Sequence, residues 1–210
     1  MKYIILCGGR YSIWETPRQL CRINNEYVVE RTIRLLRECG VTDIAISTHD
    51  ERFNQFGVEI INAENSFICC QSGYWVDAFP LIDEPVCYIF GDVVFTLEAL
   101  KEIVNTDTDD IQFFASCPPY VPEYIKIWEE PFAFKVRNTK HFAEAVQKTK
   151  QLQDERKFNR LPPISWELWQ VIKNTPLNEV RHNYHVVNDI SCDIDRPEDL
   201  PKLQALFNGR

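Results

Sequence analysis

The fold is decided by the first strand-like stretch of the chain, Tyr3-Ile4-Ile5-Leu6-Cys7-Gly8-Gly9-Arg10. Its first four residues are one aromatic, two β-branched and one further apolar side chain, a composition typical of a buried strand. The two glycines permit a tight turn and let a ligand approach the backbone closely. In an α/β protein the carboxyl end of the first strand commonly holds phosphate groups, and Arg10 adds a permanent cation there. The stretch therefore predicts a phosphate-binding loop, with an ordinary strand-to-loop turn as the simpler interpretation.

Segments of strand and helix character alternate along the rest of the chain. Val28 to Cys39 carries its apolar residues on one face and is followed by Gly40, the pattern of an amphipathic helix with a glycine end. Because a strand is expected on either side of this helix, the order predicts a parallel sheet. Further strands are expected at Asp43–Thr48, Val58–Ile61, Val86–Phe90, Ile111–Ala115, Phe132–Val136 and His185–Val187, and further helices after Thr96, at Thr139–Leu152, at Ser165–Lys173 and at the carboxyl end.

Composition limits the class of protein. At 210 residues with 45% hydrophobic residues, the chain is long enough for one domain, residues 1–210, with a full core. No apolar run approaches the roughly 20 residues that span a bilayer, and the first apolar run is too short for a signal peptide. We therefore expect a soluble cytoplasmic protein with no membrane partner, while a homodimer stays open.

The charge and the cysteines exclude two further classes. A net charge of −8 argues against a nucleic-acid binder, which needs a basic surface for the phosphate backbone. The eight cysteines form no C-x-x-C pair, so a structural zinc site is not supported. With no export signal, we expect these cysteines to be reduced thiols.

Two acidic sites are candidates for metal binding. Asp92 follows Gly91 at the end of a predicted buried strand, where a carboxylate is well placed to hold a divalent cation. Asp193-Ile194-Asp195 places two carboxylates on the same side of an extended backbone. The simpler interpretations are a turn aspartate at Asp92 and a helix cap at Asp195. The two sites are far apart in sequence, so only the fold could bring them together.

Several short sequence motifs, which include these acidic sites, are spread over nearly the whole chain. Leu6-Cys7-Gly8-Gly9-Arg10 is followed by Trp14 and by Thr16-Pro17-Arg18-Gln19-Leu20, then by Gln71-Ser72-Gly73, Gly91-Asp92 and Glu130-Pro131. The chain ends with Asp193-Ile194-Asp195-Arg196-Pro197-Glu198-Asp199-Leu200. These motifs resemble the L-A-G-G opening and the Q-x-G, G-D and E-x-P segments of the sugar-phosphate nucleotidylyltransferases. The last one resembles the E-I-D-T-P-E-D-L ending of the related cytidylyltransferases.

The resemblance implies a fold, a reaction and a set of roles. The fold would be a single Rossmann-like domain of the GT-A type, α/β, with a mostly parallel central sheet flanked by helices. The reaction would be Mg²⁺-dependent transfer of a nucleoside monophosphate from a nucleoside triphosphate to a phosphorylated sugar, polyol or similar acceptor, as in polysaccharide biosynthesis. The implied roles are metal binding by Asp92, Asp193 and Asp195; catalysis by Arg10 and Arg18; nucleotide binding by Leu6, Gly8, Gly9, Arg10, Gln71 and Gly73; and acceptor binding by Lys126 and Lys135.

The chain also departs from the family pattern. Arg10-Tyr11-Ser12-Ile13 replaces the family's G-x-G-T-R portion, and Arg18 stands where the family has a lysine. We expect Arg10 and Arg18 together to replace the missing charges, with a guanidinium fork in place of a point charge. Gln71 suits a pyrimidine such as thymine or uracil, whereas the acidic ending resembles that of the cytidylyltransferases. The two signals disagree about the base, so we expect a pyrimidine nucleotide, with CTP as the first choice.

Three other functions stay open at this point. A glycosyltransferase of the same fold normally carries D-x-D after the central strand, where this chain has Asp92-Val93-Val94. A non-catalytic nucleotide sensor would fit the altered glycine loop. An interaction domain would use exposed aromatic residues such as Trp14, Tyr74 and Trp75.

Overall fold

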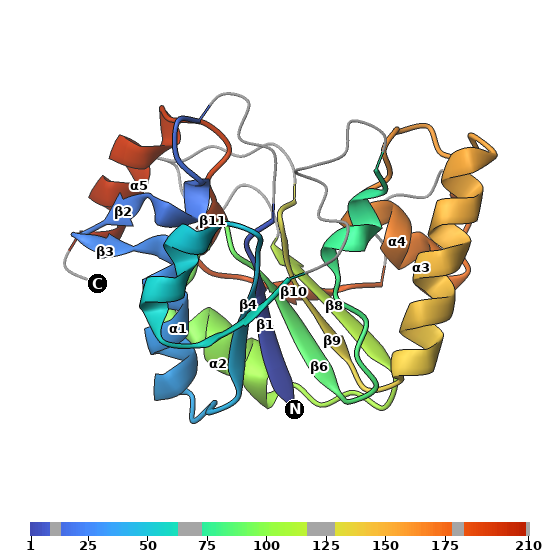
Figure 1. Ribbon diagram of the computed structural model, residues 1–210, viewed down its shortest axis with the longest axis horizontal. Helices are drawn as coiled ribbons and strands as arrows, with labels where there is room; N and C mark the ends of the chain where they lie inside the picture. Colours follow the sequence, from blue (N-terminus) through green and yellow to red (C-terminus); the bar gives the residue numbers. More distant parts are fainter. Residues whose placement is uncertain (9–13, 63–72, 117–128, 178–182, 209–210) are drawn as a thin grey trace.

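A seven-stranded sheet forms the centre of the computed structural model, which describes residues 1–8, 14–62, 73–116, 129–177 and 183–208 (Figure 1). Its strand order is β10-β8-β9-β6-β1-β4-β5. All neighbouring strands are parallel except β9, which is antiparallel to both β6 and β8. The strands are β1 (Lys2–Leu6), β4 (Ile44–Ser47), β5 (Glu59–Ile61), β6 (Val86–Phe90), β8 (Ile111–Ser116), β9 (Pro131–Val136) and β10 (His185–Val187). The predicted α/β class and mostly parallel sheet are confirmed.

The central strands are buried on both faces. All five residues of β6 are buried, and Tyr3 to Leu6 of β1 are at most 6% exposed. A strand covered on both faces has no solvent side, so its sequence is a continuous apolar run rather than an alternating one. This explains why the sequence located β1 and β6 directly.

The helices lie in two pairs at the two ends of the sheet in this view (Figure 1). α1 (Val28–Glu38) packs against α2 (Leu97–Asn105), and α3 (Thr139–Asp154) packs against α4 (Ser165–Lys173). Gly40 adopts a φ of 82° just after α1, which agrees with the expected glycine end of that helix. The predicted helices are confirmed, and the three that were predicted with both bounds, α1, α3 and α4, agree to within two residues at each end.

A second, smaller core holds the carboxyl-terminal part of the chain. Two short sheets, β2 (Arg22–Ile23) with β3 (Glu26–Tyr27) and β7 (Val93–Val94) with β11 (Cys192–Asp193), lie beside α5 (Asp199–Phe207). Buried apolar residues of these elements, together with Val28 of α1 and Ile194, form a cluster separate from the main core; the other members are Ile23, Val94, Cys192, Leu203 and Phe207. This cluster folds the acidic end of the chain back onto the residues after β6.

Three 3₁₀ segments complete the described structure: η1 (Arg18–Leu20), η2 (Glu51–Phe56) and η3 (Trp75–Ala78). Among the described residues, none of the helices combines the length and the apolar character that crossing a bilayer requires.

Candidate active site

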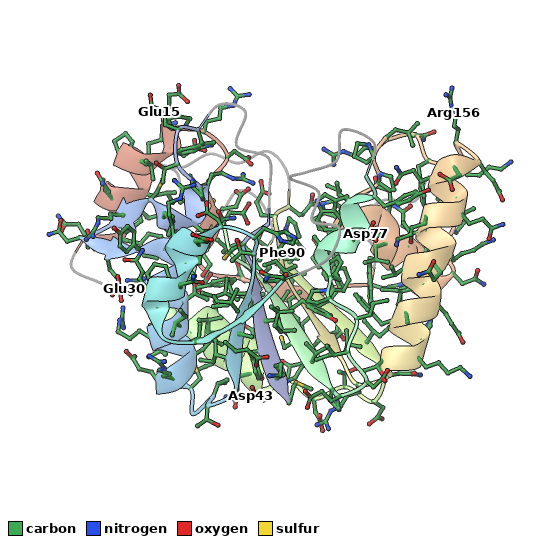
Figure 2. All side chains as sticks on the ribbon, viewed as in Figure 1. Glu15, Glu30, Asp43, Asp77, Phe90 and Arg156 are labelled. Atoms are coloured by element: carbon green, nitrogen blue, oxygen red, sulfur yellow. The ribbon has the colours of Figure 1, made fainter. Side chains whose placement is uncertain are left out.

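A cavity of about 490 Å³ opens at the carboxyl edge of the parallel strands. Figure 2 shows the two edges of the sheet: Phe90, which ends β6, lies at the centre of the molecule, whereas Asp43, which precedes β4, lies at the opposite edge. The cavity is lined by Arg18, Trp75, Phe90, Asp92, Glu129, Glu130, Pro131, Arg160, Ile164, Ser165, Trp166, Asp193 and Asp195. The cavity is bounded by η1 and β11 on one side, by the adjoining ends of β6 and β9 at the sheet, and by η3 and α4 on the other side (Figure 1). The cavity therefore lies where α/β proteins of this type bind their ligands.

The short sheet of β7 and β11 joins the two acidic sites that the sequence singled out. Asp193 pairs with Val93, and the amide of Ile194 donates to the carbonyl of Asp92 at 2.9 Å. Because Val94 and Ile194 are both fully buried in the second core, this pairing is held by apolar packing as well as by hydrogen bonds. The structure thus places Asp92, Asp193 and Asp195 on one cavity.

A cluster of three carboxylates within this cavity is suited to a hard cation. Glu130, Asp193 and Asp195 each offer an oxygen, and these oxygens all lie within 4.8 Å of one another. Two ligands on opposite sides of Mg²⁺ are separated by about 4.2 Å, twice a bond of about 2.1 Å. Carboxylates are the ligands that Mg²⁺ prefers, so the donor set fits the ion that the sequence predicted.

Arg18 lies between the acidic sites. Its Nη2 donates to Asp92 Oδ2 at 2.7 Å, and its Nη1 donates to the carbonyl of Ile194 at 2.8 Å. The same Nη1 lies 3.5 Å from Asp195 Oδ1. The guanidinium thus uses its fork to hold the end of β6 against the last strand. Asp92 is therefore paired with Arg18, and the three-carboxylate cluster contains Glu130 in its place. The metal role of Asp92 stays a prediction.

Gly91 allows β6 to end against β1. Its amide donates to the carbonyl of Leu6 at 3.1 Å, and a Cβ on Gly91 would lie 2.6 Å from that oxygen and 2.8 Å from Cys7 Sγ. Contacts this short leave no room for a side chain. Burial raises the pKa of the Cys7 thiol well above its ordinary value, with a further contribution from the charge of Asp92, so the sulfur there is a neutral thiol. The close approach sets the position of Asp92.

The simpler interpretation of Asp195 as a helix cap is wrong. The last helix begins at Asp199 with Glu198 as its N-cap residue. Asp199 Oδ2 accepts the amides of Asp195 and Arg196 at 3.1 and 2.9 Å, so Asp199 is the residue that satisfies the backbone there. The Asp195 carboxylate instead lines the cavity.

The structure places Lys135 away from the cavity, and its predicted role in acceptor binding stays a prediction without support from the geometry. β9 runs opposite to the parallel strands, so Pro131 at its start lies on the cavity, whereas Lys135, which pairs with Cys87 near the start of β6, lies toward the other edge. The Lys135 ammonium is buried and donates to the carbonyls of Ile103, Val104 and Thr106 at 2.6 to 3.1 Å. It therefore satisfies the carbonyls at the end of α2. Burial lowers the pKa of Lys135 below its ordinary value.

Replacing Lys135 should affect stability rather than substrate binding. Lys135→Met keeps a side chain of similar length but leaves three carbonyls at the end of α2 without this donor, so we expect a loss of about 1 to 3 kcal/mol in the free energy of unfolding. Nucleotide and acceptor binding should stay unchanged. Denaturant unfolding and calorimetry measure the two effects. A selective loss of acceptor binding at unchanged stability would contradict this structural role.

The remaining predicted residues have mixed outcomes. Leu6 is buried at the end of β1 and Gly8 follows it, so both lie at the carboxyl edge of the sheet. Gly73 is half-buried just before η3. Their nucleotide-binding roles stay predictions. Gly9, Arg10, Gln71 and Lys126 lie outside the described residues.

Sequence analysis missed several residues of the cavity. Glu130 was noted only as part of a motif, because its strand was not known to run antiparallel. Arg160 belongs to none of the motifs in the sequence, and Ser165 was only the start of an expected helix. Trp166 is 3% exposed and packs edge-on against Phe113, with ring centroids 5.0 Å apart, while also lining the cavity. No signal in the sequence marked Arg160 or Ser165 as cavity residues.

The aromatic residues of the interaction-domain alternative are not exposed. Trp14 donates through Nε1 to the carbonyl of Asp195 at 3.3 Å, and Tyr74 donates to the Asp154 carboxylate at 2.8 Å. Trp75 stacks on Phe90 with ring centroids 6.1 Å apart. All three are only partly accessible, so they do not form an exposed docking surface.

The fold is that of the sugar-phosphate nucleotidyltransferases. The chain matches the structure of a protein assigned as a glucose-1-phosphate thymidylyltransferase of Bacillus anthracis with a TM-score of 0.61 at 18% identity, covering 100% of this chain and 96% of that chain. It matches the CTP:phosphocholine cytidylyltransferase of Streptococcus pneumoniae with a TM-score of 0.54 at 17% identity, covering 99% of both chains.

A third solved structure supports the same fold. The inositol-1-phosphate CTP transferase of T. maritima matches with a TM-score of 0.52 at 18% identity, covering 99% of this chain and 96% of that chain. No protein-family model and no curated protein matches the sequence. At these identities the likeness concerns the fold, and the chemistry of the site has to be argued from this chain's own residues.

Proposed function

We propose that the protein is a Mg²⁺-dependent nucleotidyltransferase that transfers a nucleoside monophosphate from a pyrimidine triphosphate to a phosphorylated small acceptor. The observation that carries this proposal is the cavity at the carboxyl edge, where Glu130, Asp193 and Asp195 cluster beside Arg18. Three carboxylates beside a guanidinium supply what a metal–triphosphate complex needs, because the ion is held by oxygens and the phosphates by a fixed cation.

In the proposed reaction an acceptor phosphate oxygen attacks the α-phosphorus of the triphosphate. A new oxygen–phosphorus bond forms, the bond to the β-phosphate oxygen breaks, and pyrophosphate leaves with that electron pair. Mg²⁺, when bound by Glu130, Asp193 and Asp195, would neutralise charge on the phosphate oxygens. Arg18 would hold the β- and γ-phosphates from the side of η1. The chain's contribution is positioning and charge complementarity rather than a covalent intermediate.

A pyrimidine nucleotide, CTP first, is the proposed donor. The three structural neighbours carry thymidylyl or CTP chemistry in their names, and all of these are pyrimidine nucleotides. The resemblance of Asp193-Ile194-Asp195 to the ending of the cytidylyltransferases favours CTP over a thymidine or uridine triphosphate. The neighbours' names include a sugar phosphate, a polyol phosphate and an amino-alcohol phosphate, so the acceptor proposed here is defined by its phosphate.

The glycosyltransferase alternative is disfavoured by the packing after β6. The second aspartate of a D-x-D motif would stand at position 94, where Val94 is fully buried in the second core. A carboxylate buried there would be unfavourable without a partner. The nucleotide-sensor alternative is compatible with the same cavity and is separated from the enzyme by turnover.

A panel of nucleotides tests the proposal. Thermal shift with CTP, UTP, ATP, GTP and dTTP, each with and without Mg²⁺, should show the largest stabilisation with CTP, and only with the metal. A ligand at 100 times its dissociation constant adds about 2.7 kcal/mol to the free energy of unfolding. Pyrophosphate release with a set of phosphate monoesters should follow. Binding without release for every acceptor would indicate a sensor, and binding of no nucleotide would contradict the proposal.

Arg18→Lys should weaken binding of the nucleoside triphosphate more than binding of the monophosphate. A lysine cannot contact Asp92, Ile194 and a phosphate at once, because it offers a point charge in place of a fork. We expect the dissociation constant of CTP to rise about tenfold, or about 1.4 kcal/mol, with a much smaller change for CMP. Calorimetry measures both constants. Arg22→Lys is the matched control, since Arg22 donates to the carbonyl of Asn25 outside the cavity.

An equal loss for CTP and CMP would contradict this role. Arg18 would then act on the base, on the sugar or on the position of the last strand.

A further inference from the structure

The side of the cavity opposite the acidic cluster carries a cation that no described residue engages. Among the described lining residues the cavity has two guanidiniums, Arg18 and Arg160. Arg18 is held by Asp92 and by the carbonyl of Ile194. Arg160 is exposed, and within the described ranges nothing forms an ion pair or hydrogen bond with it. Arg160 is therefore a second cation of this cavity, and its charge is not engaged by any of the described residues.

The amino end of α4 lies on the same side of the cavity. Ile164, Ser165 and Trp166 line the cavity, and α4 begins at Ser165. The first intrahelical hydrogen bond runs from the amide of Leu168 to the carbonyl of Ile164, so the amides of the first turn have no acceptor within the helix. The partial positive charge of a helix amino end favours an anion there.

Ser165 provides an independent sign of a ligand. Its side chain is fully buried, it lines the cavity, and its Oγ has no hydrogen-bond partner among the residues that the structure describes. A buried hydroxyl without a partner costs free energy and is rare in proteins unless a bound group completes it. The hydroxyl is thus placed to donate to an oxygen that enters the cavity.

The acidic groups near this end of α4 do not accept hydrogen bonds from the donors described above. Glu167 Oε2 accepts the amide of Ile164 at 2.8 Å, so this carboxylate caps the residue before the helix. Glu130 belongs to the carboxylate cluster with Asp193 and Asp195. The two sides of the cavity therefore differ: carboxylates gather at the sheet edge, and donors gather at α4.

We infer that Arg160, Ser165 and the first turn of α4 form an anion subsite that holds the phosphate of a phosphate-monoester acceptor. This inference rests on the proposed function, which supplies the reaction in which the subsite acts. It assigns to this side of the cavity the role predicted for Lys135, which does not line the cavity. The subsite explains why a buried hydroxyl is left without a partner in the absence of ligand.

Direct binding without nucleotide tests the subsite. Calorimetry with inorganic phosphate and with glycerol 3-phosphate compares the full chain with Arg160→Ala and Ser165→Ala. We expect each variant to bind both probes at least about tenfold more weakly, and to bind CTP with Mg²⁺ within about twofold of the unmodified chain. Lys157→Ala is the matched control, because Lys157 is an exposed cation of the same connection that does not line the cavity.

The melting temperature of Ser165→Ala provides a second measurement, which separates ligand binding from a purely structural role of Ser165. Because the Ser165 hydroxyl has no partner, Ser165→Ala should leave the melting temperature of the ligand-free protein unchanged or higher while weakening phosphate binding. A lower melting temperature with unchanged phosphate binding would assign Ser165 to the core and overturn the subsite.

The remaining outcomes separate the subsite from the proposed function. Unchanged phosphate binding in Arg160→Ala, in a protein that binds CTP and releases pyrophosphate, would overturn the subsite alone. Equal weakening of CTP and phosphate would assign Arg160 to the triphosphate and also overturn it. Selective loss of phosphate binding in a protein that binds no nucleotide would support the subsite and reject the proposed function.

Discussion

Asp193→Asn is expected to weaken Mg²⁺-dependent nucleotide binding at least about 100-fold. Asp193 is buried and contributes one of the three oxygens of the carboxylate cluster. Loss of residues that only support metal ligands costs 10- to 100-fold in metal affinity or activity, so loss of a direct ligand should cost at least as much. Calorimetric titration with Mn²⁺, in the absence of nucleotide, measures the metal site itself. Titration with CTP and Mg²⁺ measures its consequence.

Stability should not account for this loss. Asparagine keeps the shape of the side chain and removes one of three neighbouring negative charges, so the free energy of unfolding should change by about 1 kcal/mol or less. Asp107→Asn is the matched control, since the Asp107 side chain is 84% exposed and does not line the cavity. Metal binding that is equal in Asp193→Asn and the unmodified chain would remove Asp193 from the site.

Asp92→Asn decides between the two metal-ligand sets. The sequence predicted Asp92 as a ligand with Asp193 and Asp195, whereas the structure pairs Asp92 with Arg18 and groups Glu130 with the other two. A loss of Mn²⁺ binding as large as that of Asp193→Asn would support the predicted set. A small loss would support the set with Glu130.

Gly91→Ala is expected to have the second large effect. The added Cβ would lie 2.6 Å from the carbonyl oxygen of Leu6, a backbone atom that cannot move without displacing β1. Overpacking of this kind costs about 1 to 3 kcal/mol. Because Asp92 follows directly, the shift would also move its carboxylate away from Arg18. We expect a lower unfolding midpoint in denaturant together with a loss of Mg²⁺-dependent CTP binding.

A second variant identifies which contact matters. Cys7→Ala removes the sulfur that the new Cβ would meet at 2.8 Å but leaves the Leu6 carbonyl in place. The Gly91→Ala, Cys7→Ala double variant should therefore recover neither stability nor binding. Full recovery would show that the sulfur, rather than the backbone, is the obstacle.

The sequence predicted those strands and helices whose burial is visible in the local pattern of apolar residues. Tyr3–Leu6 and Val86–Phe90 are covered on both faces and are therefore continuous apolar runs, while the apolar stripe of Val28 to Glu38 reports one buried face. The direction of β9 was not predicted, because a strand has the same local pattern in parallel and antiparallel sheets. That direction brings Glu130 to the cavity and takes Lys135 away from it.

The sequence by itself determined the class of fold, through the hydrophobic periodicity of its strands and helices, and it marked Asp92, Asp193, Asp195 and Arg18 as residues able to bind metal and phosphate. Only the tertiary structure decided how these groups combine. Packing of Val94 and Ile194 in the second core closes a separation of about a hundred residues, so that Arg18 pairs with Asp92 and Glu130 joins the carboxylates. Side-chain chemistry is a property of each residue alone, whereas the distances between residues follow from long-range packing, which no local pattern contains.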